Sequence, residues 1–104
     1  MQSLAQPEVN LVQEEPEEYL NITFIFNQQI QFTNQKTQYT DGYRNNYIYR
    51  LASNCNRAGL SQSDSEHLCT QHFDLPEREI KEAVKSVYSH YKPEFANTAK
   101  LQSS

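Results

Sequence analysis

Residues 40–60 read TDGYRNNYIYRLASNCNRAGL, and they contain the only two glycines of the sequence, Gly42 and Gly59. Its apolar residues recur at the three- and four-residue spacing of one helix face: Tyr47, Ile48, Leu51, Ala52 and Cys55. Gly59 stands where a helix end favours the left-handed conformation, and Leu60 supplies the apolar contact that follows such an end. Asp41 is placed to serve as the N-cap of this helix or as a carboxylate in its first turn. We therefore predict a central helix from about Gly42 to Arg57.

The polar side of this central helix carries the residues that we predict to bind nucleic acid. Arginine and asparagine suit hydrogen bonding to phosphates and base edges. The predicted contacts are Arg44, Asn45, Asn46, Arg50, Asn54 and Arg57. Arg44 is unexpected in a first turn, because a cation there opposes the helix dipole at a cost of about 0.3–1 kcal/mol. It has either a functional role or an acidic neighbour as its partner, and both interpretations stay open. Tyr43 or Tyr49, if exposed, could stack on an unpaired base.

Two capping signals predict two further helices. Ser63 and Glu66 have the spacing of a capping box, in a helix that ends before Asp74. Asp74 and Glu77 repeat this spacing at the start of a last helix, which Pro93 ends or kinks. The apolar stripe of that last helix comprises Ile80, Ala83, Val84, Val87, Tyr88 and Tyr91. We interpret the basic residues of this helix as a solvated face. Acidic residues stand near its start and lysines toward its end, which is the order that compensation of the helix dipole alone would produce.

Residues 19–34, YLNITFIFNQQIQFTN, are ambiguous. Alternating apolar residues, many of them β-branched or aromatic, favour a strand. No partner strand is evident after residue 40, however, and an isolated hairpin is marginally stable at best. The possible turn also lacks the glycine that short hairpins prefer. We therefore assign a helix to this segment.

The predicted fold is all-α, a small bundle of about four helices with a disordered acidic N-terminal leader. The leader covers residues 1–18, the helical domain residues 19–96 and a flexible tail residues 97–104. The glutamates and prolines of the leader are typical of a disordered linker. The predicted core comprises Ile48, Leu51, Ala52, Cys55, Leu68, Phe73, Ile80, Val84, Val87 and Tyr91.

The net charge of −4 is distributed unevenly. Residues 1–40 hold five glutamates and one lysine, so residues 41–104 are balanced and nucleic-acid binding there is not excluded.

Cys55 and Cys69 both fall at apolar helical positions. The sequence has no signal peptide and no apolar run of membrane length, which predicts a cytoplasmic protein with free thiols and no membrane contact.

No catalytic, metal or cofactor site is predicted. His67, Cys69 and His72 resemble a ligand set, but positions i and i+5 of a helix diverge by about 140°, and a structural zinc site needs a fourth ligand. Two glycines cannot build a glycine-rich phosphate loop. We predict that the chain is not itself an enzyme.

A family resemblance adds to this interpretation. Gly42-x-Arg44-Asn45, the helix through Leu51-Ala52 and the run Gly59-Leu60-Ser61 resemble the primase C-terminal helical domain of plasmid, phage and mobile-element replication proteins. The second half of that family's domain is matched by Leu75-Pro76, Glu79-Ile80, Ser86, Tyr88 and Tyr91. The resemblance therefore covers about residues 39–92. It implies a non-catalytic accessory domain of a primase–helicase protein that assists contact with template and nucleotide. The implied partners are single-stranded or template DNA, bound weakly, and neighbouring primase or helicase domains.

Two alternatives stay open. The first is a docking module between enzymatic domains, for which salt-insensitive binding to a neighbouring domain would be diagnostic. The second is a helix-turn-helix protein, whose pattern Leu51-Ala52 and Gly59-Leu60-Ser61 loosely imitate. In such a protein, Asp64 and Glu66 would lie on the recognition helix where phosphates approach, which counts against this alternative. Duplex-specific binding to a palindromic site would favour this second alternative.

Overall fold

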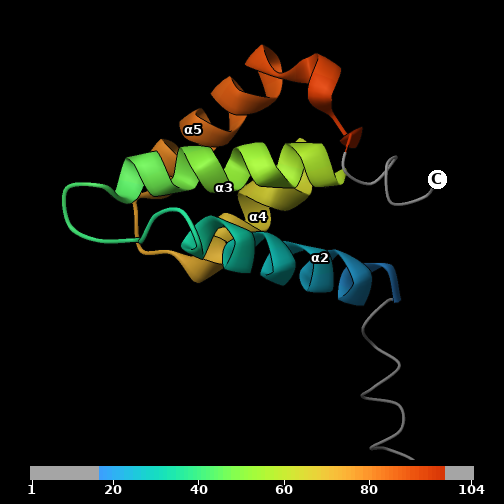
Figure 1. Ribbon diagram of the computed structural model, residues 1–104, viewed down its shortest axis with the longest axis horizontal. Helices are drawn as coiled ribbons and strands as arrows, with labels where there is room; N and C mark the ends of the chain where they lie inside the picture. The colour runs from blue at the N-terminus through green and yellow to red at the C-terminus, as the bar shows by residue number, and fades with distance from the viewer. Residues whose placement is uncertain (1–16, 98–104) are drawn as a thin grey trace, which may run out of the picture.

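A computed structural model describes residues 17–97. Its elements are α2 (Glu17–Asn34), α3 (Arg44–Ala58), α4 (Gln62–His72), α5 (Glu77–His90) and the 3-10 helix η1 (Lys92–Glu94). Residues 17–97 contain no strand, so the predicted all-α fold of about four helices is confirmed (Figure 1). Residues 1–16 of the predicted leader and 98–104 of the predicted tail lie outside the described residues.

The helix α3 is the centre of the bundle. It lies between α5 and α2, with α4 behind it (Figure 1). Its core face buries the stripe that the sequence predicts, together with one polar residue: Tyr47, Ile48, Leu51, Ala52, Cys55 and Asn56. The opposite face, which carries the predicted contact residues, is therefore left for solvent and for the neighbouring end of α2.

The C-terminal end of α3 is built as predicted. Gly59 has a φ of 91°, its N–H donates to the Asn56 carbonyl, and the Leu60 N–H donates to the Cys55 carbonyl over 3.1 Å. This is the closing turn that requires a left-handed residue. Leu60 is buried beneath it. The tight turn lets α4 start almost at once and fold back against the core.

The predicted start of α3 is wrong in detail. The helix begins at Arg44, Tyr43 precedes it, and no side chain caps its first turn. Asp41 instead accepts a hydrogen bond from the Arg44 guanidinium over 2.6 Å. The carboxylate thus neutralises a first-turn cation rather than capping backbone N–H groups.

Both predicted capping boxes are also wrong. The Ser61 hydroxyl caps α4, accepting a hydrogen bond from the Asp64 N–H over 3.0 Å, so the helix starts before Ser63. Pro76 precedes α5 without a side-chain cap. The carboxylate of Asp74, which the sequence assigned to that role, accepts a hydrogen bond from the Tyr39 hydroxyl over 2.6 Å.

The helix assigned to residues 19–34 is confirmed, and α2 begins two residues earlier. Among residues 21–34, where side-chain burial is described, its buried positions are Phe26, Gln29 and Thr33, which repeat at helical spacing. Phe24 and Phe32 point outward. Two of the three buried positions are polar, which is why the apolar residues alone showed no clear helical period.

Eight of the ten predicted core residues are buried. Phe73 is half-buried, and Tyr91 is exposed because α5 ends one residue before it. The buried core also contains Phe26, Tyr47, Leu60, Cys69, Ala83 and Tyr88. Cys55 and Cys69 are buried free thiols, as predicted. No helix within residues 17–97 is both long and apolar enough to cross a membrane.

Candidate nucleic-acid interface

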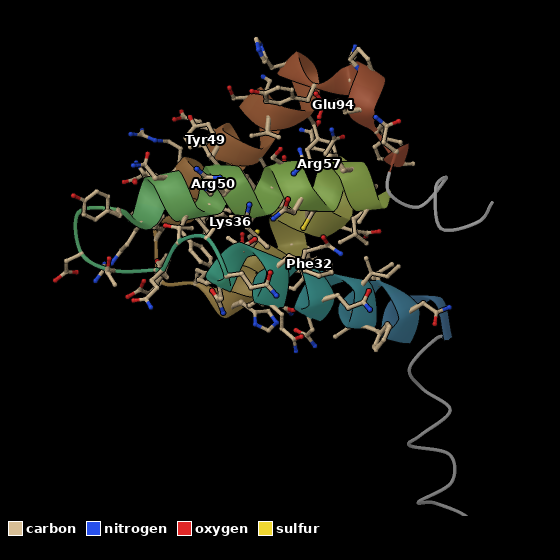
Figure 2. All side chains as sticks on the ribbon, viewed as in Figure 1. Phe32, Lys36, Tyr49, Arg50, Arg57 and Glu94 are labelled. Carbon is tan, nitrogen blue, oxygen red and sulfur yellow. The ribbon has the colours of Figure 1, made fainter. Side chains whose placement is uncertain are left out.

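A groove runs between the C-terminal end of α2 and the outer face of α3 (Figure 2). Its first part is a pocket of about 390 Å³ lined by Phe32, Thr33, Gln35, Lys36, Arg50, Ser53, Asn54 and Arg57. Its second part, about 410 Å³, is lined by Lys36, Thr37, Tyr43, Asn46, Tyr49 and Arg50. Lys36 and Arg50 line both parts, so the two pockets adjoin each other, and we call them together the α2–α3 groove.

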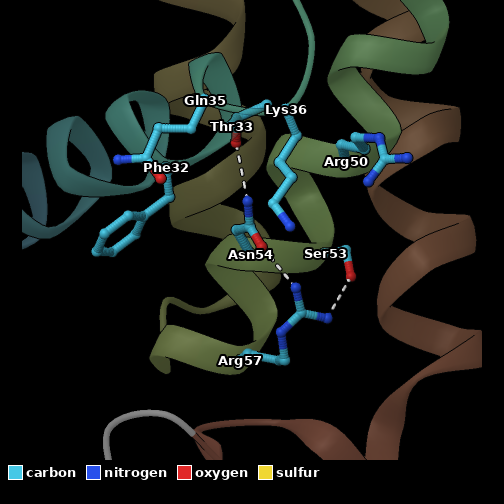
Figure 3. A pocket seen from close by; sticks show the side chains of 8 residues that line it. All are labelled: Phe32, Thr33, Gln35, Lys36, Arg50, Ser53, Asn54 and Arg57. Atoms are coloured by element: carbon cyan, nitrogen blue, oxygen red, sulfur yellow. Dashed lines mark hydrogen bonds between the residues drawn. The ribbon is translucent and has the colours of Figure 1, made fainter.

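The α2–α3 groove is positively charged. Among residues 17–97, three cationic side chains line it, Lys36, Arg50 and Arg57, and no carboxylate does. Within residues 17–97, Lys36 and Arg50 have no ion pair and no side-chain hydrogen bond, so both charges are available to a ligand. Figure 3 shows Lys36 reaching from the end of α2 across the face of α3, toward the side that carries Arg50. Cations that lie together along a groove attract a polyanion.

Within residues 17–97, Arg57 is the one groove cation whose side chain has hydrogen-bond and ion-pair partners. Its guanidinium donates to the Ser53 hydroxyl over 2.9 Å and to the Asn54 side-chain carbonyl over 2.5 Å, as the dashed lines in Figure 3 show. It also lies 3.4 Å from a carboxylate oxygen of Glu94. Asn54 in turn donates to the buried Thr33 hydroxyl over 2.9 Å. The packing of α2 on α3 therefore sets the position of Arg57.

Three exposed aromatic rings border the cations. Phe32 is 47%, Tyr43 60% and Tyr49 42% exposed, and all three line the groove. Exposed rings beside a cationic track are the usual stacking platforms for unpaired bases. Tyr47 has a different role, because it is buried and its hydroxyl donates to the Asn34 side chain over 2.7 Å.

The six predicted contact residues lie in two different places on the structure. Asn46, Arg50, Asn54 and Arg57 line the α2–α3 groove. The other two, Arg44 and Asn45, line a separate pocket of about 360 Å³ together with Leu75, which precedes α5, and Glu79 in its first turn.

Arg44 is paired rather than free. Its guanidinium lies 2.6 Å from the Asp41 carboxylate and 3.9 Å from that of Asp74. The Tyr39 hydroxyl and then the Arg44 charge lower the pKa of Asp74. Of the two interpretations that the sequence left open for this arginine, the structure shows the acidic partner.

Sequence reasoning missed the contribution of α2 to the groove. Phe32, Thr33, Gln35 and Lys36 come from a segment that carries no recognisable binding motif. One signal was present, because Lys36 is the only lysine or arginine in the first 40 residues. Only the antiparallel packing of α2 and α3 reveals that it lies opposite Arg50.

The described residues offer little other chemistry. Within residues 17–97, no three histidine, cysteine or acidic side chains are arranged to hold a metal ion. Burial raises the pKa of the Cys69 thiol to about 12 and raises that of Cys55 as well. A thiol that stays protonated at neutral pH is a poor nucleophile.

One comparison with known proteins gave a match, to a protein family. The family model described as Primase C terminal 1 (PriCT-1) matches residues 33–91, more than half of the chain. The match runs from the last turn of α2 through α5 and includes every groove residue except Phe32. Neither the curated proteins nor the solved structures gave a significant match.

Proposed function

This chain belongs to the primase C terminal 1 family, and from that premise we propose that its α2–α3 groove contacts single-stranded template DNA. The domain then serves as a non-catalytic accessory to a primase or primase–helicase. We also propose that the parent protein is of the plasmid, phage or mobile-element type and works in the cytoplasm, where buried free thiols such as Cys55 and Cys69 stay reduced.

The observation that carries this proposal is the composition of the groove. In the described part of the chain, three cations and no carboxylate line it, although the net charge of the whole sequence is −4. The bordering rings of Phe32, Tyr43 and Tyr49 favour an unpaired strand over a duplex, because bases must be splayed out to stack on them. With so few cations, binding should be weak, at about 10⁻⁴–10⁻⁶ M at physiological salt.

Fluorescence anisotropy with a labelled single-stranded oligonucleotide tests the proposal. Arg50→Ala should weaken binding across sequences and flatten the salt dependence by about 0.7 in the log–log slope, the loss of one phosphate contact. Lys85→Ala is the matched control. It removes one exposed positive charge from α5, away from the groove, and Lys85 has no ion pair within residues 17–97. Equal effects of the two variants would reject the groove as the binding site.

The Arg44→Ala variant compares the binding contribution of an ion-paired arginine with that of Arg50. Because the Arg44 charge is shared with Asp41 and lies near Asp74, we expect this variant to weaken binding less than Arg50→Ala does. Arg57→Ala should fall between them, since its guanidinium lines the groove but also faces Glu94.

A second candidate function is supported by the outer face of α2. Phe24 is 64% exposed, and residues 19–35 contain no charged residue. Interface cores are depleted in charge and enriched in aromatic residues. This face suits docking of a neighbouring primase or helicase domain. Salt-insensitive binding to such a domain that Phe24→Ala weakens and Arg50→Ala leaves unchanged would support docking over template contact.

A further inference from the structure

The end of the α2–α3 groove meets the C-terminal part of the described chain. Glu94 of η1 places its carboxylate 3.4 Å from the Arg57 guanidinium, with both side chains about two-fifths exposed, at 40% and 38%. Glu94 does not line the groove itself, and Figure 2 shows it approaching from the side of α5. Of the three groove cations, Arg57 is the one that a carboxylate contacts within residues 17–97.

This carboxylate is held in place by the backbone around it. The buried Asn56 side chain donates to the Tyr91 carbonyl over 2.9 Å, just before η1. The Ala96 N–H donates to the Asn56 main-chain carbonyl over 2.8 Å, just after it. Ala96 has a φ of 63°, an uncommon conformation for a residue other than glycine. Asn56 thus clamps both ends of the turn that presents Glu94.

We propose that Glu94 is an intramolecular competitor for the phosphate site at Arg57, so that a ligand entering this end of the groove must displace it. The inference rests on the proposed function and specifies how that site is regulated. Any change that draws the turn Tyr91–Ala96 away from α3 would free Arg57 and raise the affinity of the groove for anions.

The strength of the contact suits such a role. An ion pair this exposed is worth about 0.2–1 kcal/mol, which a phosphate can replace. The same range corresponds to an affinity change of about 1.4- to fivefold. Glu94 therefore tunes binding rather than blocking it.

The experiment measures single-stranded oligonucleotide binding by anisotropy at low salt. Glu94→Gln removes the charge while keeping the shape of the side chain. Glu82→Gln is the matched control, because it makes the same change of net charge at an exposed α5 position with no ion pair within residues 17–97. The Arg57→Ala variant is tested with and without Glu94→Gln.

We expect Glu94→Gln to bind about 1.4- to fivefold more tightly than the unchanged protein. Glu82→Gln should bind as the unchanged protein does, and the gain from Glu94→Gln should disappear in the Arg57→Ala background. A Glu94→Gln affinity equal to that of Glu82→Gln, or a gain that persists without Arg57, overturns the inference. If Arg50→Ala weakens binding while Glu94→Gln gives no gain, the inference fails and the proposed function stands. If the unchanged protein does not bind the oligonucleotide at all, both fail.

Discussion

Asn54 of α3 donates a hydrogen bond to the hydroxyl of Thr33 in α2 over 2.9 Å. Thr33 is buried and donates in turn to the Gln29 carbonyl over 2.7 Å. The carbonyl end of the same Asn54 amide accepts from Arg57. One buried hydroxyl therefore orders two side chains of the groove and joins the two helices that form it.

Thr33→Val should destabilise the protein by about 1–3 kcal/mol, because it keeps the shape of the side chain but leaves the Asn54 amide without its acceptor. Thr33→Ser should cost less, since it keeps the hydroxyl. Urea denaturation of the two variants measures the difference in the free energy of unfolding. Equal stability of Thr33→Val and the unchanged protein would show that the hydrogen bond does not hold α2 to α3.

Tyr88→Phe tests the polar contact inside the core. The Tyr88 hydroxyl donates to the Leu60 carbonyl over 2.6 Å and lies 2.7 Å from the Ser65 hydroxyl, so it ties α5 to the start of α4. Its removal leaves a buried carbonyl unpaired, and we expect a loss of about 1–3 kcal/mol. Tyr49→Phe is the control, because Tyr49 is exposed and its hydroxyl has no hydrogen bond within residues 17–97. Similar losses for the two variants would contradict this account.

Stability should fall at alkaline pH. Burial raises the pKa of the Cys69 thiol from 9.0 to about 12 and also raises that of Cys55 and Tyr88. Above pH 9 the unfolded chain loses thiol protons that the folded protein retains, so the free energy of unfolding decreases as the pH rises. We expect these groups to cause little change in the free energy of unfolding below pH 9. Between pH 9 and 12 they should lower it progressively. Urea midpoints that stay constant from pH 8 to 11 would contradict the burial of both thiols.

Sequence patterns predicted the helices whose buried faces are continuous and apolar. The stripes of α3 and α5 and the left-handed Gly59 are local features that the chain shows without its tertiary structure. The capping boxes failed because spacing alone does not say which partner a side chain takes. Asp74 accepts from Tyr39, 35 positions away in the sequence, rather than capping α5.

The candidate site could be predicted only in part. Helical spacing places Arg50, Asn54 and Arg57 on the polar side of α3, and the structure finds all three in the groove. Lys36 and Phe32 join them only because α2 packs antiparallel to α3. At this contact the buried Thr33 hydroxyl accepts a hydrogen bond from Asn54, and no pattern of apolar residues reveals such a polar contact.

The most direct test of the α2–α3 groove is a map of amide chemical shifts. Isotope-labelled protein is titrated with a single-stranded oligonucleotide at low salt, and the perturbed residues are placed on the fold. Template contact in the groove predicts that the largest changes fall in residues 32–37 and on the outer face of α3 around Arg50, with the exposed face of α5 around Lys85 unchanged. Changes centred on α5, or no changes at all, would contradict the account.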